Sequence, residues 1–200
     1  FNGFEPKPAA PGAVRTRGPG REYLSFPDYY AWSERIAEPF GGRSGGRGHS
    51  VDTCTGRVSY RGHAAVQEDI DNLKAAIDGR PHEDVFMPAI ASSYVAATFA
   101  NEYYRTHEEY EQAVSDALRE EYKAIVDAGF ILQIDDPRLV TYYMMHPELS
   151  VADCRKWAAE RVEVINDSLR GVPPEKVRFH TCYSIDVGPR IHEMDLKDIV

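Results

Sequence analysis

The sequence predicts an α/β protein in which parallel strands alternate with helices. Apolar residues recur at helical spacing in three segments, 64–79, 106–129 and 150–169. Each of these segments is followed by a short run typical of a strand, at 85–91, 130–135 and 177–183. Strands joined in this way lie parallel, with right-handed crossovers. Together with a strand at 55–62, the units fit the middle strands of a (β/α)₈ barrel or an open doubly wound sheet.

The first two elements of this series have clear local signals. TGRVSYRG at 55–62 is typical of a short strand, and the helix at 64–79 ends at Gly79. One stripe of that helix is apolar and consists of Val66, Ile70, Leu73 and Ile77. VFMPAIA at 85–91 is a continuous apolar run, which predicts a strand buried on both faces.

Capping signals predict the next two helices. Thr106 with Glu109 begins a helix that ends at Gly129, and FILQID at 130–135 follows as a strand. Ser150 with Asp153 begins the second helix, after a predicted loop at 142–150. VRFHTCY at 177–183 is the last predicted strand, and DLKDIV at 195–200 begins another helix. The core positions expected on the helix after Ser150 are Trp157, Val162, Ile165 and Leu169.

Composition narrows the class of protein. The 200 residues, of which 42% are hydrophobic, are enough for one domain at 55–200, preceded by a Gly/Pro/Arg-rich extension at 1–54. Within the extension, GGRSGGRG at 41–48 is expected to be a flexible loop, and the aromatic residues of 23–40 could form a lid. A formal charge of −9 disfavours binding to nucleic acid.

Cysteine spacing and the length of the apolar runs indicate in which cellular compartment the protein is expected. Three widely spaced cysteines suit a reducing environment, and no apolar run is long enough to span a membrane. We therefore expect a cytoplasmic protein without a membrane partner. Because the sequence opens without methionine and ends inside a predicted helix, we also expect it to be a fragment of a longer chain.

Polar residues collect where two predicted strands end, which is where the chemistry of parallel α/β folds gathers. The strand at 130–135 ends QIDDP, with Gln133 and Asp135 on one face. A buried carboxylate there needs a donor, although Asp135 and Asp136 could equally cap the loop before Pro137. The strand at 177–183 carries His180 and Cys182 on one face, two potential metal ligands. Taken alone, this short motif is more simply explained as a hydrogen-bonded polar pair under a loop.

Taken in order, these segments resemble a known family. MPAIASSY, a long helix, DAGFILQIDDP and VRFHTCYS followed by GPRIHEMDLKDI are similar to cobalamin-independent methionine synthase, and above all to short homologues of its catalytic domain. The resemblance covers roughly residues 55–200 and implies a zinc-dependent (β/α)₈ barrel. The wider superfamily of this methionine synthase fold also includes uroporphyrinogen decarboxylase, which uses no metal.

The resemblance implies transfer of a methyl or other alkyl group to a small thiol. His180 and Cys182 match two zinc ligands, and Asp135 matches the carboxylate that holds the amino group of homocysteine, with Gln133 beside it in the site. Asp136 stands where the family usually has glutamate. The family's other zinc ligands, a glutamate and a cysteine, come from strands beyond residue 200. No separate catalytic acid or base is assigned.

Several alternatives remain at this point. The alkyl donor could be a methylated folate, although the folate-binding domain of the long enzymes has no counterpart in this sequence. A related branch of the family opens epoxides with the thiol of coenzyme M. A protein that binds a metabolite or a partner without catalysis is a different class of explanation. So is an enzyme without metal that uses Asp135 and His180 as acid and base.

Overall fold

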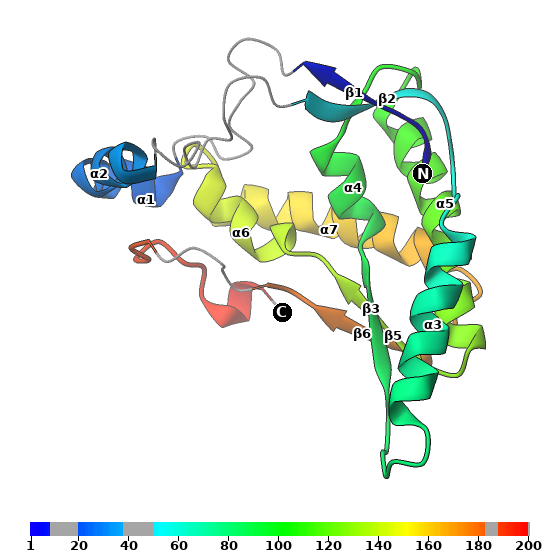
Figure 1. Ribbon diagram of the computed structural model, residues 1–200. Helices are drawn as coiled ribbons and strands as arrows, with labels where there is room; N and C mark the ends of the chain where they lie inside the picture. The colour runs from blue at the N-terminus through cyan, green and yellow to red at the C-terminus, as the bar shows by residue number, and fades with distance from the viewer. Residues whose placement is uncertain (9–19, 38–49, 183–187, 200) are drawn as a thin grey trace.

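The fold was analysed in a computed structural model, which describes residues 1–8, 20–37, 50–182 and 188–199 (Figure 1). The predicted loop at 41–48 lies outside these residues. Six strands are described: β1 Asn2–Pro8, β2 Ser50–Ser59, β3 Phe86–Ile90, β4 Ala100–Asn101, β5 Ile131–Asp135 and β6 Val177–His180. Seven helices accompany them: α1 Arg21–Ser25, α2 Pro27–Ala37, α3 His63–Ile77, α4 Ser92–Thr98, α5 His107–Asp127, α6 Arg138–Met145 and α7 Val151–Ser168. Short 3₁₀ helices cover Pro174–Lys176 and Leu196–Asp198.

A three-stranded parallel sheet, ordered β3-β5-β6, confirms the predicted α/β class. Figure 1 shows its strands joined through helices, with α4 and α5 between β3 and β5, and α6 and α7 between β5 and β6. In the register, Leu132 pairs with Met87 and Val177, and Asp135 pairs with Ile90 and His180. Because paired residues point to the same side of a sheet, the register decides which side chains share a face.

The strand predicted at 55–62 is confirmed as part of β2, but it does not join the parallel sheet. It lies in a second sheet, ordered β1-β2-β4, where it is antiparallel to β1 and parallel to β4. The ring of Phe4 on β1 packs against the rings of Phe99 and Tyr110, which holds this sheet against α5. The parallel sheet therefore has three strands, and the described residues form no closed barrel.

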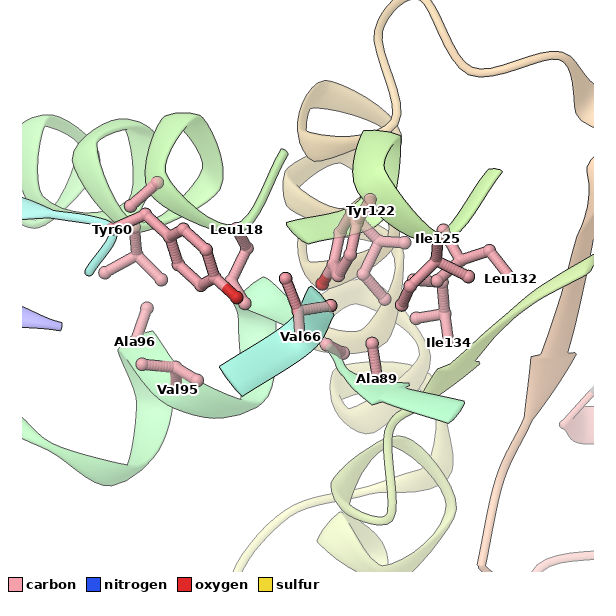
Figure 2. Close-up of a cluster of buried hydrophobic side chains, with 14 of the residues drawn as sticks. Tyr60, Val66, Ala89, Val95, Ala96, Leu118, Tyr122, Ile125, Leu132 and Ile134 are labelled. Carbon is pink, nitrogen blue, oxygen red and sulfur yellow. The ribbon is translucent and has the colours of Figure 1, made fainter. Parts of the chain in front are cut away.

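The core lies between α5 and one face of the parallel sheet. Leu132 and Ile134 of β5 are completely buried, and Tyr122 and Ile125 of α5 lie close to them (Figure 2). The Tyr122 hydroxyl donates a hydrogen bond to the carbonyl oxygen of Ile90 at 2.5 Å, so α5 is also tied to the end of β3. The predicted apolar stripe of α3 contributes Val66 and Ile70 as buried residues.

Both capping predictions are confirmed. The Thr106 hydroxyl accepts from the amide nitrogen of Glu109 at 3.1 Å, and α5 is followed by Gly129 with a φ of 98°. At α7, Ser150 and Asp153 form the complete reciprocal capping box. Because these bonds satisfy amide groups that a helix start leaves free, they fix where both helices begin.

The parallel sheet is less completely buried than the sequence predicts. The prediction that β3 is buried on both faces is wrong, because Phe86 is 44% exposed and Pro88 is exposed too. β3 is an edge strand, and these side chains point to the face opposite α5. At the other edge, β6 ends at His180, and Phe179 is 48% exposed. The predicted continuation to Tyr183 lies outside the described residues.

Two local predictions on either side of the α7 start also need correction. The predicted loop at 142–150 is helical at its start, because α6 continues to Met145. Tyr142 stacks on Trp157 of α7 with 3.7 Å between the ring centroids, which explains why this stretch is ordered against α7. Val162 was expected in the core but is 41% exposed, whereas Ile165 is buried. No helix in the described ranges has the length and apolar character needed to cross a membrane.

We predict that Leu132→Ala lowers the free energy of unfolding by about 2–5 kcal/mol, because it leaves a cavity at the centre of β5. Leu196→Ala is the matched control, since Leu196 is 71% exposed, and its effect should stay within about 0.5 kcal/mol. Urea unfolding followed by circular dichroism measures both. Equal effects of the two substitutions would contradict the placement of Leu132 in the core.

Candidate functional site

The parallel register brings Asp135 and His180 together at the carboxyl ends of β5 and β6. They are paired residues of the two strands, and His180 Nδ1 lies 3.0 Å from Asp135 Oδ1. An ionised carboxylate can only accept, so the imidazole donates through Nδ1. The Nε2 of the neutral ring then carries the lone pair. Nε2 is therefore the ring nitrogen that could bind a ligand, in a ring that a carboxylate orients.

Gln133, on the central strand β5, donates a hydrogen bond to the carboxylate of this pair. Its side chain is 8% exposed, and its Nε2 donates to the same Asp135 Oδ1 at 2.8 Å. The sequence suggested Gln133 as a substrate-binding residue. In the structure, one of its amide hydrogens is committed to Asp135.

The neighbouring carboxylate has a different role. Asp136 is 1% exposed, and its Oδ1 accepts from the amide nitrogens of Arg138 at 2.9 Å and Leu139 at 3.3 Å. The Ser93 hydroxyl donates to its other oxygen. Asp136 therefore caps the start of α6. Of the two uses considered for the Asp135–Asp136 pair, Asp136 takes the structural one, while Asp135 faces His180.

Cys182 lies two residues beyond the end of β6 and is half-buried. The ladder of β6 stops at His180, so strand geometry no longer determines the direction of the thiol relative to the imidazole. Within the described ranges, no group of three or more His, Cys, Asp and Glu side chains is arranged to hold a metal ion.

The donor chemistry around His180 nevertheless suits zinc. Metal-binding histidines usually donate their second ring N–H to a carboxylate or carbonyl, as His180 does to Asp135. Imidazole nitrogen and thiolate sulfur are both typical zinc ligands. His180 and Cys182 therefore fit as part of a zinc site that would need further ligands.

The other two cysteines are buried and lie on β2 and α7, outside the parallel sheet. Burial raises the pKa of the Cys54 thiol, which lies 3.4 Å from the carbonyl oxygen of Gly56. Burial also raises the pKa of Cys154 on α7. A raised pKa lowers the thiolate fraction at neutral pH, so neither residue is prepared to act as a nucleophile or metal ligand.

A buried glutamate of α1 holds the segment that follows the Cys182 region. Glu22 is 4% exposed, and its Oε1 accepts from the amide nitrogens of Ile191 at 2.6 Å and His192 at 2.8 Å. Ser25 Oγ and His192 Nε2 lie 2.6 Å apart. Figure 1 shows α1 and α2 beside this carboxy-terminal segment.

The preceding residue ties α1 to the connection between α6 and α7. Arg21 donates to the carbonyl oxygens of Tyr143 at 2.9 Å, of His146 at 3.1 Å and of Leu149. Sequence reasoning expected aromatic residues of 23–40 to form a lid and missed the Arg21–Glu22 pair. The signal was weak, because two charged residues after a glycine are ordinary on a protein surface.

An open hollow of about 260 Å³ lies at the opposite end of the parallel sheet. Its lining includes Lys74, His82, Glu83 and Lys176, together with residues around the starts of β3 and β5. Ligands of parallel α/β folds bind at the carboxyl ends of the strands. The hollow is therefore separate from the Asp135–His180 site.

No protein-family model matches the sequence, and no curated protein matches it either. Solved structures do show a related fold. One is assigned to a vitamin B12-independent methionine synthase of Listeria monocytogenes, with a TM-score of 0.53 and 18% identity over 66% of this chain. Another is a B12-independent methionine synthase from Shewanella sp. W3-18-1 in complex with selenomethionine, with a TM-score of 0.50 and 20% identity over 68% of this chain. The matches cover 41% and 36% of those two chains. At this identity, the likeness concerns the fold alone.

We predict that iodoacetamide at neutral pH, with a chelator present to remove bound metal, alkylates Cys182 before Cys54 and Cys154. Cys182 is half-buried, whereas the other two thiols are at most 3% exposed and have raised pKa values. Peptide mass spectrometry at increasing reaction times gives the three rates, and labelling in urea should make them similar. Labelling of either buried cysteine as fast as Cys182 would contradict the described burial.

We also predict that Glu22→Ala increases amide hydrogen exchange at Ile191 and His192, because both amides lose their carboxylate acceptor. Glu163→Ala is the control, since Glu163 is exposed on α7. Exchange measured by NMR on the two variants separates these effects. Unchanged exchange at Ile191 and His192 in Glu22→Ala would show that Glu22 does not hold this segment.

Proposed function

We propose that this chain is part of a zinc-dependent enzyme that transfers a methyl or other alkyl group to a small thiol. The contact between Asp135 and His180 at the carboxyl ends of β5 and β6 carries this proposal. Cys182 follows two residues later, and the fold is shared with B12-independent methionine synthases. The fold alone fixes no activity, so the proposal depends on these residues.

In this proposal, His180 and Cys182 hold zinc together with ligands from outside the described residues. Asp135 holds Nδ1 of the imidazole, which would leave Nε2 as the nitrogen that binds zinc. Zinc at this position would lower the pKa of a bound substrate thiol and so present it as a thiolate. Asp135 would also accept a hydrogen bond from the substrate amine, the role that the resemblance gives to this position.

The proposed function also requires more parallel strands than the three that the described residues form. β3 and β6 are both edge strands, and the face opposite α5 exposes Phe86, Pro88 and Arg178. All-parallel sheets are almost always covered on both faces. We therefore propose that further strands continue the sheet into a (β/α)₈ barrel, with this open face as the barrel interior.

One observation favours a second candidate function. Asp135 and His180 are in contact, whereas no group of three metal-binding side chains is present in the described part of the chain. A carboxylate that orients an imidazole is also the arrangement of a general base. A metal-free enzyme in which His180 accepts a proton is therefore the alternative, and metal analysis separates the two.

We predict that the full-length protein purifies with about one zinc per chain, and that His180→Ala and Cys182→Ser each lose most of this metal. His82→Ala is the matched control, because His82 is an exposed residue at the other end of the sheet. Elemental analysis gives the zinc content, and alkylation of L-homocysteine by a methylated folate is assayed beside it.

Wild-type zinc content and turnover in either variant would contradict the metal assignment. A wild-type protein without zinc in which His180→Ala still abolishes turnover would support the metal-free alternative.

A further inference from the structure

We propose that Gln133 is a positioning residue that directs the two oxygens of Asp135 to different partners. Oδ1 holds His180, and Oδ2 is kept available for the ammonium group of an α-amino thiol. This inference rests on the proposed function for the identity of the ligand. The positioning of His180 rests on the described geometry alone.

Gln133 is well placed to act in this way because it cannot easily move. It lies on β5, the central strand, and pairs with Pro88 on one side and Arg178 on the other. Its side chain is 8% exposed, so few alternative rotamers are open to its amide. A hydrogen bond from a fixed donor constrains its acceptor more strongly than a bond from a mobile surface residue.

Both hydrogen bonds that the Asp135 carboxylate accepts from side chains of described residues go to one oxygen. Gln133 Nε2 is 2.8 Å and His180 Nδ1 is 3.0 Å from Oδ1. Two donors on Oδ1 set the plane of the carboxylate, and Oδ2 retains its capacity to accept. The Asp135 side chain is 31% exposed, so a ligand can reach it.

The charges near Asp135 leave room for a cationic ligand. Within the described ranges, His180 is the one basic group that pairs with Asp135. The guanidinium of Arg178, which is on the same sheet face, lies 4.2 Å from the centre of the Phe86 ring, towards the start of β3. An ammonium group that reaches Oδ2 would form a charge-assisted hydrogen bond with the carboxylate.

Asp136 cannot take this role. Its two oxygens are occupied by the amides of Arg138 and Leu139 and by the Ser93 hydroxyl, and it is 1% exposed. Selection for an amino group therefore depends on Asp135 and on the residue that orients it. The amino thiol itself comes from the resemblance, and Gln133 would sustain the preference for its amine.

The test compares Gln133→Met with Gln112→Met in the full-length protein. Methionine keeps the length of glutamine but removes the amide donor. Gln112 donates to Asp116 at 3.0 Å on the exposed surface of α5, so its replacement removes a similar Gln–Asp bond away from the site. Thermal unfolding by circular dichroism shows whether each variant remains folded.

Calorimetric titration with L-homocysteine and with 4-mercaptobutanoate, which lacks the amine, measures the preference for the amino group. We expect the wild type and Gln112→Met to favour L-homocysteine, and Gln133→Met to lose about tenfold of that preference. Asp135→Asn provides the reference for complete loss of the carboxylate. Equal weakening of both ligands, or an unchanged preference in Gln133→Met, overturns the role in amine selection.

Ring ¹⁵N chemical shifts of His180, recorded after a chelator has removed any bound zinc, test the positioning role without any thiol. The Nδ1–H form should dominate in the wild type and Gln112→Met, whereas Gln133→Met should show a mixture of tautomers. Unchanged ring signals in Gln133→Met overturn the positioning of His180. If the wild type binds neither thiol, the proposed function and the amine selection both fail, and the ring signals decide the positioning role alone.

Discussion

The parallel register between β5 and β6 is the constraint on which the candidate site depends. It places Asp135 beside His180, two residues that are 45 positions apart in the sequence. Leu132 and Ile134 stabilise this register, because both side chains are completely buried in the core on the face of β5 towards α5. A slip of one residue would turn these side chains to the open face and separate the carboxylate from the imidazole. Core packing and site geometry are therefore two consequences of one strand alignment.

Two adjacent carboxylates at the end of β5 divide structural and functional tasks. Both oxygens of the Asp136 carboxylate accept hydrogen bonds, from the amides of Arg138 and Leu139 and from the Ser93 hydroxyl. These bonds fix the start of α6. Asp135 is partly exposed, and one of its carboxylate oxygens accepts hydrogen bonds from Gln133 and His180. Because successive residues of a strand point to opposite faces, such a pair can serve the helix layer and the open face together. Alternation separates the two side chains but does not say which face the helices cover, so the sequence pattern alone left their roles undecided.

Features governed by local physics could be predicted from the sequence. The caps at Thr106 and Ser150 depend on residues three positions apart, and both helices begin where expected. Pairing between distant segments could not be predicted, because alternation within a strand does not name its partner. β1 joins β2 across about fifty residues, and Glu22 reaches the amides of Ile191 and His192. The exposure of β3 was missed for the same reason, since an apolar run does not reveal that its strand lies at a sheet edge. At the candidate site, the resemblance pointed to Asp135 and His180, but their direct contact and the buried position of Gln133 required the fold.

The most direct test of the proposed chemistry is X-ray absorption at the zinc edge of the full-length protein, with and without L-homocysteine. A zinc site built on His180 and Cys182 should show nitrogen and sulfur at typical zinc distances of about 2.0–2.1 and 2.3 Å. Addition of the thiol should increase the sulfur contribution, because the substrate joins the metal. A first shell without sulfur, or one that the thiol leaves unchanged, would contradict the account that these strand ends form a zinc site for thiol alkylation.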